Sequence, residues 1–175
     1  NDERDIEIVG LIASIFAYGN VKQIENTLKK FIIAFEGKPY SFIKNFSLSK
    51  NSKKISGIKH RFYTEDDVLK LFIILNKEIK KHKSIKQIFL QAYNISDENV
   101  KNGISNFSNH FINSFIETFG EVSTGIKFMF PLPEKGSACK RMNLFLRWMV
   151  RKDELDFGLW NEIPTNKLII PVDTH

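Results

Sequence analysis

The chemistry that this sequence offers is concentrated in one lysine and one aspartate. Lys140 follows the segment Gly136-Ser-Ala-Cys, whose small residues lead into an amphipathic helix expected at about 138–151. The helix dipole is positive at its N-terminus, so a lysine in the first turn is expected to bind an anion or to react as a neutral amine. Asp173 follows the apolar run Leu168-Ile-Ile-Pro-Val, and it fits either a helix N-cap or a catalytic carboxylate.

The loop before this lysine also has the features of a phosphate-binding site. Gly136, Ser137 and Cys139 are small enough for a phosphate to approach the backbone, whose N–H groups at a helix start are ready donors. Arg141 and Arg147 lie further along the helix and are candidate phosphate contacts. Arg147 is equally suited to covering the flank of the helix.

Aromatic residues provide candidates for stacking on a nucleobase, namely Tyr18, Trp148, Phe157 and Trp160. For each of them core packing is the alternative, and the pattern favours it. His60, His82 and His110 are scattered in the sequence and predict no metal site. His175 is expected to have a structural role, bonding the backbone near Asp173.

Helical periodicity runs through most of the chain and sets the expected positions of these residues. No stretch shows the alternation of a half-buried strand. Asn20, Thr64 and Ser84 are expected helix N-caps, and residues 45–57 are expected to form a basic surface loop. We therefore predict one all-α domain over residues 1–175, a helical bundle with a hairpin-type loop before the lysine helix. The predicted helices are 6–19, 20–37, 64–80, one opening at 84, 98–119 and 138–151.

The charge balance favours an anionic partner. Lys and Arg number 26 against 20 Asp and Glu, a formal net charge of +6, and the excess is gathered in polar clusters. Such clusters are the electrostatic footprint of a protein that binds a phosphate backbone. Lysine-rich faces that are merely solvated are the alternative.

Composition excludes several classes of protein. With 42% hydrophobic and 26% charged residues, the chain has the composition of a globular domain, not of a disordered one. The single Cys139 excludes an internal disulfide and a cysteine-built zinc or iron–sulfur site within these residues. Apolar runs are too short to span a membrane, and the acidic start is unlike a signal peptide. We expect a cytoplasmic monomer of a bacterium, associated with the nucleoid, and a fragment of a longer chain with helices after His175.

Two motifs together resemble the helix-hairpin-helix DNA glycosylase superfamily, which includes endonuclease III. Gly-x-x-x-Lys at a helix start matches the family's hairpin and lysine helix, and Val-Asp-Thr-His matches the segment that carries its aspartate. Lys140 thus corresponds to the catalytic lysine, Gly136 to the first hairpin glycine and Asp173 to the aspartate. Asn143 and the segment Leu11–Tyr18 also match positions of this superfamily. Taken as a whole, the sequence also resembles a bacterial family of uncharacterised proteins.

The resemblance implies excision of a damaged base from double-stranded DNA by a bifunctional glycosylase/AP lyase. The damaged nucleotide would be flipped into a pocket, where a neutral Lys140 attacks C1′ and forms a Schiff base. Asp173 would stabilise positive charge on the sugar and handle the lysine proton. No cofactor is implied within these residues, and the iron–sulfur cysteines of endonuclease III would fall beyond His175.

Departures from the family pattern leave other functions open. Ala138 replaces the second hairpin glycine, and the Lys140-to-Asp173 separation is longer than in endonuclease III. That length is more similar to archaeal 8-oxoguanine glycosylases, which suggests oxidised guanine as the lesion. The alternatives are a helical nucleic-acid-binding module without catalysis and a plain helical domain whose basic clusters are only solvated.

Overall fold

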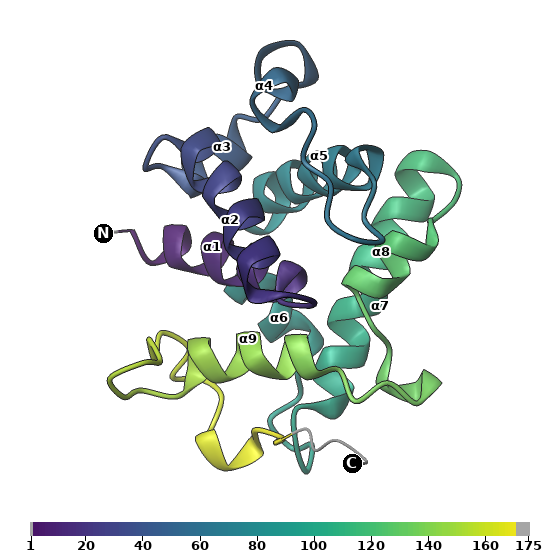
Figure 1. The fold of residues 1–175 in the computed structure, drawn as a ribbon. Helices are drawn as coiled ribbons and strands as arrows, with labels where there is room; N and C mark the ends of the chain where they lie inside the picture. Colours follow the sequence, from purple (N-terminus) through teal and green to yellow (C-terminus); the bar gives the residue numbers. More distant parts are fainter. Residues whose placement is uncertain (1, 171–175) are drawn as a thin grey trace.

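The chain folds into a bundle of α-helices in a computed structural model, which describes residues 2–170 (Figure 1). Within this range the β-type pairings are two isolated bridges, so the all-α prediction is confirmed. No helix of residues 2–170 is both long and apolar enough to cross a bilayer. In chain order the elements are α1 (Glu3–Phe16), α2 (Val21–Phe35), α3 (Pro39–Lys44), α4 (Leu48–Ile55), α5 (Glu65–His82), α6 (Ile85–Ala92), α7 (Lys101–Phe119), α8 (Thr124–Met129), the 3₁₀ turn η1 (Pro133–Lys135), α9 (Lys140–Val150) and the 3₁₀ turn η2 (Thr165–Lys167).

Three helices begin at the predicted N-caps. The side chain of Asn20 accepts a hydrogen bond from a first-turn amide of α2, and that of Ser84 does the same for α6. Thr64 and Asp67 form a reciprocal capping box at the start of α5, in which each side chain accepts from the other's backbone N–H. These bonds satisfy amides that have no acceptor within the helix, which is why the signals are visible in the sequence.

Three short helices depart from the prediction. Residues 45–57 are not a continuous loop, because α4 occupies most of them and buries Ile55. Its last turn carries Lys53 and Lys54, which suit the negative end of the helix dipole. The two short helices α3 and α8 were likewise not expected. Each is only one or two turns long, so its apolar residues are too few to show a helical period.

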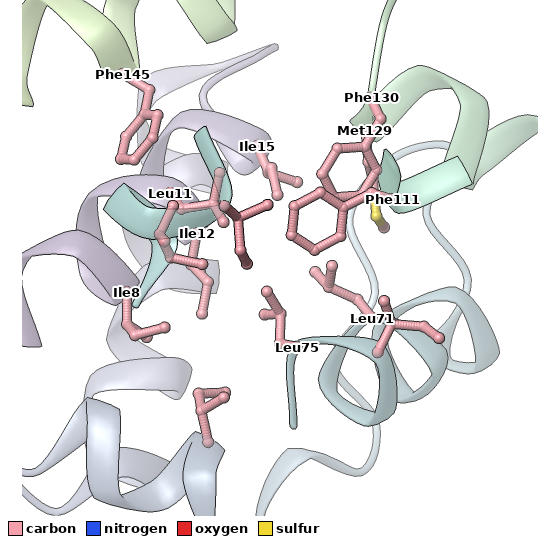
Figure 2. Packing of buried hydrophobic residues seen from close by; sticks show 14 of the residues in the cluster. Ile8, Leu11, Ile12, Ile15, Leu71, Leu75, Phe111, Met129, Phe130 and Phe145 are labelled. Atoms are coloured by element: carbon pink, nitrogen blue, oxygen red, sulfur yellow. The ribbon is translucent and has the colours of Figure 1, made fainter. Parts of the chain in front are cut away.

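The core surrounds α1, which contributes five fully buried apolar side chains, four aliphatic and one aromatic. Figure 2 shows the aliphatic residues of α1 facing side chains from α5, α7, the end of α8 and α9. Burying each such side chain contributes roughly 1.5–3 kcal/mol. The residues labelled in this core are Ile8, Leu11, Ile12, Ile15, Leu71, Leu75, Phe111, Met129, Phe130 and Phe145.

The helix that begins with Lys140 packs directly against α1. Gly10 makes this close approach possible, since a Cβ at that position would lie 3.0 Å from the Cε of Met149 and 3.4 Å from a ring carbon of Phe145. In Figure 1, α9 runs beside α1, and α7 and α8 lie toward its N-terminal end. The core thereby fixes the position of the first turn of α9.

Candidate functional site

Lys140 is the first residue of α9 and lines a pocket of about 550 Å³. The walls come from α7, α8, the loop 130–139 and the first turn of α9. Among the described residues that line the pocket none is acidic, and Glu134 nearby is engaged by Ser105 and Asn109 of α7. An anion is therefore the ligand charge that this pocket favours. Its cationic lining residues are Lys127, Lys135, Lys140 and Arg141.

The loop before Lys140 uses two of the predicted phosphate donors for its own structure. The amide of Gly136 donates to the carbonyl oxygen of Pro133 at 3.1 Å, and the amide of Cys139 donates to Ser137 Oγ at 3.1 Å. Because these N–H groups are satisfied within the loop, a phosphate would have to compete with the loop for the Gly136 and Cys139 amides, and the predicted contact stays a prediction. Ser137 lines the pocket with an exposed side chain.

Asn143 and Cys139 hold the loop against α9. The Nδ2 of Asn143 lies 3.2 Å from the carbonyl oxygens of both Ala138 and Cys139, so it closes the turn that leads into the helix. Cys139 adopts a left-handed backbone conformation with φ of 47°, and its thiol is buried against the carbonyl oxygen of Pro131. Burial raises the pKa of this thiol, which makes it a packing group.

Arg141 is an anchor of the fold. Its Nη1 donates to the carbonyl oxygen of Ile15 at 2.7 Å and to the hydroxyl of Tyr63, and its Nη2 donates to the carbonyl oxygen of Phe128. The guanidinium also lies 4.2 Å from the centroid of the Phe128 ring. The sequence predicts a phosphate contact here, and these bonds leave two of the five guanidinium N–H groups, one on Nη2 and that of Nε, for such a contact.

Arg147 follows the alternative interpretation and covers the flank of α9. Its Nε donates to the buried carboxylate of Asp156 at 2.9 Å, and the Nε of Arg151 lies 3.6 Å from the same oxygen. This pairing fixes the loop after α9. The predicted phosphate contact by Arg147 therefore competes with its ion pair to a buried carboxylate.

The four predicted stacking residues lie in three separate places. Trp160 is fully buried and donates from Nε1 to Glu7 Oε1 at 3.3 Å, so it follows the core-packing alternative that the sequence favours. Trp148 and Phe157 line a second, largely apolar pocket of about 570 Å³ beside α1. This second pocket shares no lining residue with the pocket of Lys140.

Tyr18 belongs to an aromatic cluster next to the Lys140 pocket. Its ring packs at 5.0 Å against Phe128, which lines that pocket, and stacks at 6.1 Å on Phe62. Phe62 is 62% exposed and Phe128 38% exposed, and the guanidinium of Arg61 lies 5.5 Å from the rings of Tyr18 and Phe62. Sequence analysis missed Phe62 and Phe128 because only a tertiary contact brings them beside Tyr18.

A second missed feature is a carboxylate–imidazole cluster. His82 and His110, whose scatter in the sequence predicts no metal site, meet at Glu78 in the structure. His60 stays separate, with Nδ1 3.0 Å from Thr27 Oγ1. The four-residue spacing of Glu78 and His82 on one helix was a detectable signal.

Two of the predicted site residues lie outside the part of the chain that the structure describes. Asp173 and His175 lie beyond residue 170, so the convergence of Asp173 on Lys140 stays a prediction.

A family model described as "Protein of unknown function (DUF2400)" matches residues 1–175. No curated protein and no solved structure matches the chain. The function must therefore be argued from the pocket itself.

Proposed function

Because the chain belongs to the DUF2400 family of unknown function, we propose its activity from the pocket at Lys140: a DNA repair glycosylase with AP-lyase activity. The observation that carries this proposal is the position of Lys140, an exposed residue at a helix start in a pocket whose charged lining residues, within residues 2–170, are all cationic. The pocket volume of about 550 Å³ lies within the range of small-molecule sites.

Binding of DNA would use charge and stacking together. Lys127 and Lys135 are exposed lining residues and supply sequence-independent attraction to phosphates. The exposed rings of Phe62 and Phe128 offer faces on which an unstacked base can lie. Arg61 adds positive charge at the edge of this aromatic surface.

The chemical step would be nucleophilic. The neutral Nζ of Lys140 attacks C1′, the glycosidic bond breaks, and the base leaves with the bonding electrons and takes up a proton. Opening of the sugar ring converts the new C1′–N bond into a Schiff base, and loss of a C2′ proton then expels the 3′ phosphate. Asp173 is proposed, on the family resemblance, to handle the lysine proton.

Borohydride trapping on the full-length protein tests the proposal. Duplexes that carry an abasic site or 8-oxoguanine are incubated with the wild type, Lys140→Gln and Lys135→Gln, whose lost amine lines the same pocket. We expect a covalent adduct with the wild type and Lys135→Gln and none with Lys140→Gln. Absence of an adduct on every lesion, or an adduct that survives Lys140→Gln, would overturn the catalytic proposal.

A nucleic-acid-binding module without catalysis is the second candidate. It is favoured by the loop, in which the amides of Gly136 and Cys139 are already bonded internally and Ala138 replaces a family glycine. Such a module would bind intact and damaged duplexes equally. Its affinity would fall with salt by a slope of about −0.9 per phosphate contacted. Lesion-independent binding without an adduct would select this candidate.

A further inference from the structure

Glu78, His82 and His110 bring three potential metal ligands to one point between α5 and α7. One ligand atom from each residue lies within 4.8 Å of the others. The Nε2 of His110 is 2.7 Å from Glu78 Oε2, and the Nε2 of His82 is 3.4 Å from the same oxygen. We propose that this cluster binds one divalent transition-metal ion of the Zn²⁺ class.

An unsatisfied nitrogen points to a missing ligand. The side chain of His82 is only 9% exposed, and its buried Nε2 makes no hydrogen bond within the described residues. A buried polar atom that makes no hydrogen bond destabilises the folded state. A metal ion coordinated by Nε2 would remove this destabilisation.

The Glu78 carboxylate is held in the orientation that metal coordination needs. Ser114 Oγ donates to Glu78 Oε1 at 2.6 Å, which leaves Oε2 facing the two imidazoles. Supporting bonds of this kind orient ligands in metal sites.

The two distances from Glu78 Oε2 can be compared with those in a zinc site. Bonds of about 2.0–2.2 Å in a tetrahedral arrangement separate ligand atoms by about 3.3–3.6 Å. The His82–Glu78 distance of 3.4 Å already matches, whereas the His110–Glu78 distance of 2.7 Å must widen as the ion replaces the shared proton. Two imidazoles and one carboxylate leave a fourth position for water, as in zinc sites that perform catalysis.

Neighbouring charges set the affinity of the site. Lys81 acts on His82 with a like charge and opposes a cation, while Lys77 is paired with Glu117 at 3.4 Å. The side chain of His110 is 30% exposed, which gives an ion a path from solvent. None of the three ligands lines the Lys140 pocket, so this inference goes beyond the proposed function.

Metal titration of chelator-treated protein tests the inference. Zn²⁺ binding is followed by calorimetry and Co²⁺ binding by its visible absorption, for the wild type, His110→Gln and the control Asn113→Gln. Asn113 is an exposed residue of the same helix, so the control introduces the same side chain away from the cluster. We expect one ion per chain, tetrahedral Co²⁺ bands, and an affinity at least about 100-fold lower for His110→Gln than for the control.

The outcome is decisive in either direction. Equal affinities of His110→Gln and Asn113→Gln, or no Co²⁺ absorption with the wild type, would overturn the metal site and leave the cluster as a hydrogen-bonded ion pair. Ser114→Ala keeps all three ligands, and we expect it to lower the affinity by about 10–100-fold while the stoichiometry stays at one. Unchanged far-ultraviolet circular dichroism confirms that each variant is folded.

Discussion

The Nη1 of Arg141 donates to the carbonyl oxygen of Ile15 across 2.7 Å, and this bond joins the first turn of α9 to the last turn of α1. An orphan carbonyl at the end of one helix is thus satisfied by the helix that carries Lys140. Any motion of the first turn of α9 would break this bond, so the core and the candidate site are mechanically connected.

Arg141→Lys is expected to lower the free energy of unfolding by about 2–3 kcal/mol, since one ammonium group cannot reproduce a planar guanidinium that bonds three acceptors. Urea unfolding followed by circular dichroism measures the change. Lys135→Ala, which removes an exposed cation from the same pocket, should change stability by less than about 0.5 kcal/mol. Equal stabilities of Arg141→Lys and the wild type would show that the anchor is unimportant.

Gly125→Ala is expected to weaken the start of α5. A Cβ at Gly125 would lie 2.5 Å from Asp67 Oδ2, the oxygen that accepts from the backbone and hydroxyl of Thr64. The loss should be about 1–2 kcal/mol, similar to that of Thr64→Ala. In a double-mutant cycle the two losses should be less than additive, because both substitutions remove the same capping box. Full additivity would contradict this explanation.

Cys139 is expected to react slowly with iodoacetamide at neutral pH. Its thiol is buried and burial raises its pKa, so little thiolate is exposed to the reagent. Mass spectrometry should show slow labelling of the native protein and rapid addition of one group after unfolding in urea. Labelling of the native protein as fast as of free cysteine would contradict the burial.

The stability of the protein is expected to depend on pH through Glu7. Burial raises the pKa of this carboxyl above its ordinary value of 4.5, so the protonated form is favoured in the folded state. The contribution of Glu7 to the free energy of unfolding is therefore largest below pH 4.5, and it is lost as the pH rises through the folded-state pKa of Glu7. The unfolding free energy of the wild type minus that of Glu7→Gln, measured from pH 4 to 8, should fall with rising pH. A flat or rising difference would refute the assignment.

Phe62→Ala is expected to weaken binding of single-stranded DNA while leaving stability nearly unchanged. The ring is 62% exposed, and loss of one base–aromatic stack costs about 1–3 kcal/mol, which is roughly 5- to 150-fold in affinity. Fluorescence anisotropy at fixed salt measures the change, and Leu48→Ala, at 51% exposure on α4, serves as the control. Equal affinities of both variants would remove the aromatic cluster from the proposed DNA surface.

Local signals explain which parts of the fold could be predicted from the sequence. Asn20, Thr64 and Ser84 cap helices through hydrogen bonds to residues two or three positions away. The residues that make each cap therefore lie within a short window of sequence and could be recognised there. The helix α4 escaped prediction because Ile55 is its one buried residue, and one apolar position defines no period.

The candidate site was harder to predict because its contacts are tertiary. Lys140 was identified from its place at a helix start, which is local information. The role of Arg141 depends on the carbonyl oxygens of Ile15 and Phe128, and no pattern around Arg141 reveals them. Only part of the cluster at Glu78 could be predicted from the sequence. His82 lies one turn away on the same helix, whereas His110 belongs to α7 and reaches Glu78 through a tertiary contact.

The different surroundings of the two tryptophans give the protein two separable optical signals. Trp160, sealed beside the Glu7 carboxylate, should emit at short wavelength and resist iodide quenching until the core unfolds. Trp148, on the wall of the apolar pocket, should respond to iodide and to whatever enters that pocket while the fold is intact. Emission spectra can therefore distinguish occupancy from denaturation without any added dye.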